Sequence, residues 1–244
     1  DWGIKNYQGA STEQKFLIEG IFPMGCVSIF AASGGVGKGM LTIDVALDVA
    51  CSTSDPYKSS FGPPIKEHGS VVVFCAEDSQ AEIHRRLELL DTENRRAYIE
   101  TASNPNHLKL IPLPNAGGGF SIIEQGSEKE FRESALFKKI KDDLKQIKNL
   151  KLIVFDPLAS FICGADTNDA GAMTFLMNTL QKLSSETGAC CIITHHTNKP
   201  SKNQSGKIQE PGTLEELYHS MRGSSAIGNG ARLVYVMGVA PSNI

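Results

Sequence analysis

The residues best suited to chemistry lie in a glycine-rich segment, residues 31–40, with the sequence AASGGVGKGM. Glycines let backbone N–H groups converge on phosphate oxygens, and the start of a following helix adds the positive end of its dipole. Lys38 is placed to reach the β- and γ-phosphates of a nucleoside triphosphate. The segment lies between an apolar run at 26–31 and a helical pattern at 39–50. The sequence therefore predicts a phosphate-binding loop made of Ser33, Gly34, Gly35, Val36, Gly37, Lys38, Gly39 and Met40.

The loop departs from the usual pattern G-x-x-x-x-G-K-[ST] at two positions, Ala32 and Gly39. Ala32 replaces the first glycine, which is a mild change because three turn glycines remain. Gly39 replaces a hydroxyl residue that normally supplies an oxygen to Mg²⁺ and so leaves this coordination position to water. We expect ATP and Mg²⁺ to bind, the metal to be held less firmly, and hydrolysis to be weak.

Carboxylates follow two other apolar runs. Asp156 follows LIVF, and Glu77 with Asp78 follows VVVFCA. Ligands of open α/β sheets bind outside the carboxyl ends of the strands, so we expect Asp156 to hold Mg²⁺. Glu77 can share the metal and polarise a water toward the γ-phosphate. In the alternative interpretation Asp78 is a helix N-cap, Glu77 a first-turn charge, and Asp156 the cap of a turn at Pro157.

A histidine pair, His195 and His196, ends the apolar run at 189–194. Side chains alternate along a strand, so one histidine should face the site and the other should face away. A lone histidine there is more often structural. The polar pair at a strand end favours a role in sensing the γ-phosphate.

Apolar runs and helical patterns alternate along the chain. This order predicts an α/β fold, a mostly parallel twisted sheet with helices on both faces, as one domain over residues 1–244. We expect strands at 26–31, 70–75, 108–111, 151–155, 189–194 and 232–237, and helices at 39–50, 79–90, 91–102, 134–148 and 169–187.

Composition narrows the function classes. The 244 residues have a formal net charge of −3, which argues against sequence-blind coating of nucleic acid by a bulk polycation. The six cysteines show no C-x-x-C spacing and are expected to be buried, reduced thiols. No signal peptide is visible, and the apolar runs are shorter than the ~20 residues of a membrane span. We expect a cytoplasmic protein without a membrane partner.

Six blocks of sequence, taken together, resemble the RepA-type hexameric replicative helicases of plasmids. These proteins belong to the RecA-like class of P-loop ATPases, which includes the DnaB-type helicases. The resemblance covers residues 16–237, and the order and spacing of the blocks are more specific than any one block. The blocks are AASGGVGKGM at 31–40, VVVFCAEDSQAEIHRRL at 71–87, KLIVFDPLASF at 151–161, DTND at 166–169, CIITHHTNK at 191–199 and MRGSSAIGNGARLVYV at 221–236.

The resemblance implies roles for individual residues. It makes Glu77 the catalytic glutamate and His195 the phosphate sensor, so that Glu77, Lys38 and His195 are the expected catalytic residues. Arg86 matches the Arg-Leu that closes the second block, although it could equally lie on a solvated helix face. Residues 167–169, Thr-Asn-Asp, match an Asp-Asn cluster of the family and would also cap the next helix.

The resemblance also implies a homo-oligomeric ring, most simply a hexamer, acting on single-stranded DNA in plasmid- or phage-type replication. The expected DNA-binding residues are Lys199, Lys202, Lys207 and Arg222. Relatives continue beyond the last strand to a Lys or Arg that reaches a neighbouring subunit's nucleotide, so we expect this domain to be C-terminally incomplete. The alternative function is a nucleotide-gated DNA- or partner-binding module with little turnover. A small-molecule kinase fits less well, because residues 101–148 hold no arginine-rich lid.

Overall fold

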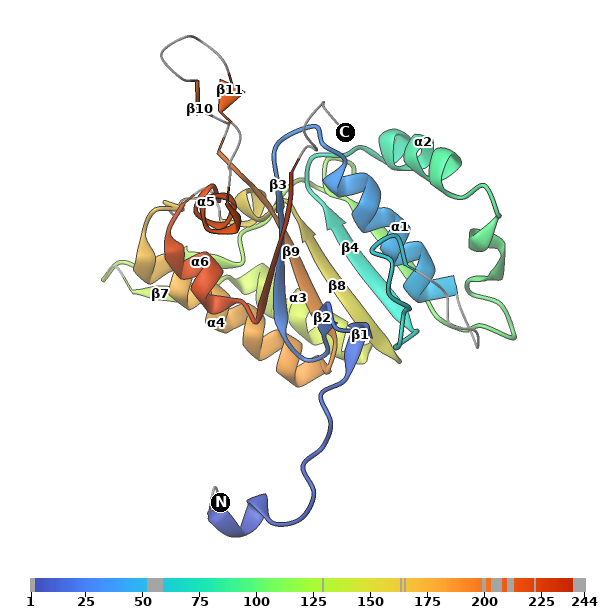
Figure 1. The fold of residues 1–244 in the computed structure, drawn as a ribbon, viewed down its shortest axis with the longest axis horizontal. Coiled ribbons are helices and arrows are strands. Elements are labelled where there is room, and N and C mark those ends of the chain that lie inside the picture. Colours follow the sequence, from blue (N-terminus) through green and yellow to red (C-terminus); the bar gives the residue numbers. More distant parts are fainter. Residues whose placement is uncertain are drawn as a thin grey trace.

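The fold is built on a six-stranded sheet in which all neighbouring strands run parallel (Figure 1). The computed structural model describes residues 3–51, 59–128, 130–162, 164, 166–198, 201–202, 208–209, 213–221 and 223–238. The side chains of residues 201–202, 208–209, 214 and 217 lie outside this description.

The order of the strands decides which chain segments meet at the sheet's carboxyl edge. The order is β12 (Leu233–Met237), β3 (Val27–Ala32), β9 (Cys190–His196), β8 (Leu150–Asp156), β4 (Ser70–Cys75) and β5 (Leu108–Pro112). The central strands are nearly continuous apolar runs because helices cover both of their faces. The histidine-bearing strand β9 thus lies between the strand that leads into the glycine loop and the strand that ends at Asp156.

Two hydrophobic cores hold the helices on the sheet. On one face α1 (Lys38–Cys51) packs over β3, β4 and β8, and α2 (Gln80–Leu90) packs against α1 and β5. On the other face lie α3 (Ala135–Gln146), α4 (Ala170–Thr187) and α6 (Ser225–Gly230). The expectation of a parallel sheet covered on both sides is confirmed.

Smaller elements surround this layered centre. The hairpin pairs are β1 (Phe16–Ile18) with β2 (Phe22–Pro23), β6 (Ile123–Gln125) with β7 (Phe131–Glu133), and β10 (Ser201–Lys202) with β11 (Ile208–Gln209). The short helices are α5 (Leu214–His219) and the 3₁₀ turns η1 (Ile4–Tyr7), η2 (Arg95–Tyr98) and η3 (Leu158–Phe161). The N-terminal segment that includes η1 extends away from the sheet in Figure 1.

One predicted helix is wrong. Residues 91–102 form only the turn η2, because Asp91 ends α2 and its carboxylate accepts the backbone N–H groups of Arg95 and Arg96. Asn94 is left-handed, with φ of 55°, and this turns the chain away from a helical path.

Side-chain caps mark the start of α2, α3 and α4. Ser79, Ser134 and Asp169 each accept a backbone N–H of the helix that follows. Asp169 therefore has the capping role that its sequence position allowed.

Of the cysteines in the described part of the chain, Cys75, Cys190 and Cys191 are buried, whereas Cys26 and Cys51 are only partly buried. Cys163 lies outside the described residues. Among the helices that the structure describes, none combines the length and the apolar character needed to cross a bilayer.

Candidate active site

The carboxyl ends of four neighbouring strands meet at one pocket of about 250 Å³. The parallel register sets Ala32 of β3 beside His196 of β9, and Cys75 of β4 beside Asp156 of β8. The pocket is lined by Gly35, Gly37, Lys38, Gly39, Met40, Glu77, Asp78, Arg86, Asp156 and His196.

The glycine loop adopts a conformation that needs glycine. Gly35 and Gly37 have φ values of 80° and 100°, in the left-handed region that side chains disfavour. Lys38 then begins α1, so the positive end of that helix dipole faces the pocket. Lys38 is 7% exposed, and its Nζ donates to the carbonyl oxygens of Ala32 (3.0 Å) and Ser33 (3.1 Å). The loop thus places Lys38 and the N-terminus of α1 on the same wall of the pocket.

Asp156 is positioned by its neighbour in the sheet. The hydroxyl of Thr194 in β9 donates to Asp156 Oδ1. Burial raises the pKa of Asp156 above its ordinary value, while the Thr194 hydrogen bond and the charge of Lys38 oppose that rise.

A magnesium ion fits the residues of this pocket. Mg²⁺ is usually held by one or two carboxylates together with phosphate oxygens and water, so a cage of protein ligands is not required. Among the described residues, no group of three or more His, Cys, Asp or Glu side chains is arranged to hold a metal ion. Asp156 and the exposed Glu77 line one pocket and would hold the ion, which would neutralise phosphate charge.

The carboxylates after β4 do not cap the next helix. Ser79 takes that position, with its hydroxyl accepting from Glu82 N at 3.3 Å. Asp78 instead accepts two hydrogen bonds from Arg86, at 2.5 and 2.8 Å. Burial raises the pKa of Asp78, against the lowering effect of Arg86. The capping interpretation of Asp78 is therefore wrong.

Arg86 belongs to the pocket and does not lie on a solvated helix face. Its side chain is 23% exposed, and its Nε donates to Glu82 Oε1 at 3.3 Å in addition to the two bonds with Asp78. Sequence spacing alone left this choice open, since i,i+4 pairing with Glu82 is equally typical of an exposed helix.

Of the two histidines, His196 lines the pocket and His195 does not. His196 Nδ1 lies 3.4 Å from Lys38 Nζ, whereas His195 is buried in the sheet and 3% exposed. Strand alternation predicts that only one of the pair faces the site, and in the structure this residue is His196. The histidine at the pocket is therefore His196, and not His195 as the sequence-based interpretation expects.

The expected DNA-binding residues are only partly described. Lys199, Lys207 and Arg222 lie outside the described residues, and for Lys202 only the backbone position in β10 is described.

The described flanks of that segment contact each other and the glycine loop. Thr197 forms a bridge with Met221, and Asn198 N donates to Ser220 O at 2.6 Å. The Thr197 hydroxyl also lies 3.0 Å from that of Ser33 in the glycine loop.

Sequence reasoning missed Thr194. Thr194 lies on the strand that neighbours the Asp156 strand, and it can be identified as a partner of Asp156 only once the order of the strands is known.

Together, the parallel sheet and the loop at the end of β3 define a RecA-like P-loop nucleotide-binding protein. The family model described as AAA domain matches residues 1–202, and the chain belongs to this family of P-loop ATPases. The matched range includes the glycine loop, Glu77, Asp156 and His196.

Proposed function

We propose that this chain is the ATP-hydrolysing motor domain of a ring-forming DNA helicase in plasmid- or phage-type replication. The observation that best supports the proposal is the convergence of Lys38, Glu77, Asp156 and His196 on one pocket from four strand ends. Each residue type matches one requirement of triphosphate hydrolysis: phosphate charge, an attacking water, a metal and a detector of the terminal phosphate.

The reaction assigns a separate task to each side chain. Lys38 leaves the carbonyl oxygens of its loop and donates to the β- and γ-phosphates. Glu77 orients a water and accepts its proton as the water oxygen bonds to the γ-phosphorus. The bond from that phosphorus to the bridging oxygen then breaks, and ADP leaves with that oxygen. Asp156 would hold Mg²⁺, which shields the phosphate charge.

Coupling to DNA would run through the end of β9. His196 faces the pocket, and the next residue, Thr197, contacts both the glycine loop and Met221. A change at the γ-phosphate can therefore reach both described flanks of the segment expected to bind DNA. We propose Lys199, Lys202, Lys207 and Arg222 as its phosphate-binding residues, in a homo-oligomeric ring.

Gly39 favours the second candidate function, a nucleotide-gated binding module with little turnover. Without a hydroxyl at this position the metal lacks a usual ligand, and slow hydrolysis would suit a protein that assembles with ATP and then recruits DNA or a partner. The two functions differ in whether DNA accelerates hydrolysis.

ATP hydrolysis measured with and without single-stranded DNA separates the candidates. The helicase proposal predicts stimulation by DNA that is lost in Glu77→Gln. ATP-dependent assembly without stimulation supports the binding module. If the wild type neither binds nor hydrolyses ATP, both proposals are wrong.

DNA binding itself should depend on salt. Each lost phosphate contact should flatten the slope of log affinity against log salt by about 0.7 for a single strand. Replacing Lys199, Lys202, Lys207 and Arg222 with alanine is expected to flatten the slope, and replacing Lys138, Lys139, Lys145 and Lys182 on α3 and α4 serves as the charge-matched control. An equal change in both variants would contradict the assignment of this segment.

A further inference from the structure

The guanidinium of Arg86 occupies the space that the first side-chain atom of a serine or threonine at position 39 would need. A Cβ built on Gly39 would lie 2.6 Å from Arg86 Nη1 and 3.3 Å from Asp156 Oδ2. The first distance is too short for a real Cβ, so any side chain at position 39 requires Arg86 to move. Gly39 therefore does more than omit a metal ligand, because its lack of a side chain makes room for Arg86.

Arg86 is held in this place by carboxylates of its own segment. Nη1 and Nη2 donate to the two oxygens of Asp78, and Nε donates to Glu82. A guanidinium has five N–H donors in a rigid planar fork, so this anchoring leaves donor capacity at Nη1, on the side that borders Gly39 and the pocket.

The next hydroxyl along α1 does not replace the missing one. Thr42 is the next hydroxyl residue in α1, and its Oγ1 donates to Lys38 O at 2.9 Å inside the helix. Thr42 is 6% exposed and is not among the residues that line the pocket. Near Gly39, the polar groups that face the pocket from other elements are those of Arg86 and Asp156.

We propose that Arg86, anchored by Asp78, takes the place of the absent loop hydroxyl and binds the phosphate oxygens on the Gly39 side of the pocket. This inference rests on the proposed nucleotide-binding function of the same site. Phosphate is a good partner for a guanidinium because its oxygens match the planar donor fork. Gly39 and Arg86 then act as a pair. The glycine leaves room for the guanidinium, and the guanidinium replaces the hydroxyl that the glycine lacks.

The pairing predicts that one substitution has opposite effects in two backgrounds. In the wild type, Gly39→Ser pushes the guanidinium off its position and weakens ATP binding. In Arg86→Ala the space is open, so the serine hydroxyl can reach the metal, and Gly39→Ser strengthens binding when Mg²⁺ is present. A simple loss of a metal ligand at position 39 would instead make the serine favourable in both backgrounds.

The test is calorimetric titration of ATP into four proteins: wild type, Gly39→Ser, Arg86→Ala and the double variant. Each is measured with Mg²⁺ and with EDTA. Arg86→Ala should weaken binding about tenfold or more, the usual effect of losing a charged hydrogen bond. Arg85→Ala is the matched control, because Arg85 pairs with the same Glu82 but does not line the pocket. Its ATP affinity should equal that of the wild type.

Arg86→Lys keeps the positive charge and serves if the alanine variant does not fold. Lysine lacks the planar fork, so weakened binding in a folded Arg86→Lys protein supports the proposal, and unchanged binding overturns it. A serine at position 39 that acts in the same direction in both backgrounds also overturns the pairing while leaving nucleotide binding in place. A wild type that does not bind ATP overturns the proposed function itself.

Discussion

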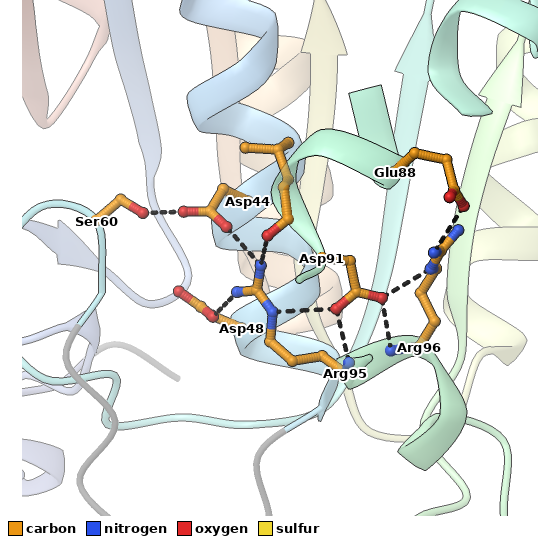
Figure 2. Close-up of polar contacts among 8 residues, drawn as sticks. Asp44, Asp48, Ser60, Glu88, Asp91, Arg95 and Arg96 are labelled. Atoms are coloured by element: carbon orange, nitrogen blue, oxygen red, sulfur yellow. Dashed lines mark hydrogen bonds and ion pairs between the residues drawn. The ribbon is translucent and has the colours of Figure 1, made fainter. Parts of the chain in front are cut away.

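Two clusters of arginine and carboxylate side chains lie beside α1 and α2. They differ in their surroundings. The pocket cluster consists of Asp78, Glu82 and Arg86 and lies beside the start of α1. The Arg95 cluster, shown in Figure 2, consists of Asp44, Asp48, Asp91 and Arg95 and ties the middle of α1 to the end of α2.

In the Arg95 cluster, the guanidinium is surrounded by its hydrogen-bond partners. Nη2 of Arg95 donates to Asp44 (2.8 Å) and to Leu90 O (2.9 Å), Nη1 donates to Asp48, and Nε lies 3.4 Å from Asp91 Oδ1. The side chains of Asp48 and Asp91 are 2% and 0% exposed. Every guanidinium nitrogen thus has a protein acceptor, and the Arg95 side chain is 11% exposed, compared with 23% for Arg86.

The comparison separates a structural role from a binding role. Both arginines pair with carboxylates, so ion pairing alone does not distinguish them. Arg86 borders a cavity and the bare backbone of Gly39, whereas Arg95 is enclosed by its partners. Changes in the pocket cluster should therefore alter ligand binding with little effect on stability, and changes in the Arg95 cluster should do the reverse.

The largest effect is expected on turnover from Glu77→Gln. An amide does not accept a proton from water, and general-base contributions are about 10²–10⁴-fold, so single-turnover hydrolysis should fall by that factor. ATP affinity and thermal stability should stay near the wild-type values, because Glu77 is exposed. Unchanged hydrolysis in a protein that binds ATP would remove Glu77 from the mechanism.

Arg95→Ala should give the largest loss of stability. It leaves buried carboxylates without their cation, and breaking such a group costs about 3–5 kcal/mol in free energy of unfolding. Arg132→Ala is the control, because the side chains of Arg132 and its partner Glu124 are 60% and 43% exposed, which predicts a loss of about 1 kcal/mol or less. Urea unfolding measures both, and equal losses would contradict the distinction between the two arginines.

The smallest expected effect is on the pH dependence of the free energy of unfolding, through Asp48. Burial raises the pKa of Asp48 to about 6, although the charge of Arg95 opposes the rise. The folded state then holds this proton more tightly than the unfolded state, whose pKa is about 3.9. The stability that this group contributes is therefore present below about pH 4 and is lost as the pH rises through about 6.

Asp48→Asn should remove that loss. Between about pH 4 and pH 6 the unfolding free energy of the wild type should fall relative to that of the variant, by at most about 1.4 kcal/mol per pH unit. Urea titrations at several pH values measure the difference. Parallel curves for the two proteins would show that Asp48 keeps an ordinary pKa in the folded state.

Much of the sheet could be predicted from sequence because its strands are buried on both faces and so appear as unbroken apolar runs. The glycine loop could be predicted equally well, since its glycines, its lysine and the flanking elements follow one another in the sequence. The failed helix at 91–102 shows the limit of periodicity, because a single carboxylate, Asp91, captures two backbone N–H groups and ends helix growth.

Relations between strands were harder to predict. The choice between His195 and His196, the support of Asp156 by Thr194, and the contact between Arg86 and Gly39 all depend on which elements become neighbours. Residue spacing along one chain contains no direct record of that order. The pairing of a glycine with an arginine 47 positions away is visible only in the folded structure.

The most direct test of the account is ATP titration of Lys38→Ala beside the wild type, with thermal unfolding of both proteins. Lys38 begins α1 and is nearly buried, and its Nζ donates to the carbonyl oxygens of Ala32 and Ser33 and lies 3.4 Å from His196 Nδ1. We predict that the variant melts close to the wild type and loses tight binding of ATP. Equal ATP affinity in the two proteins would show that the pocket at the end of β3 is not the nucleotide site.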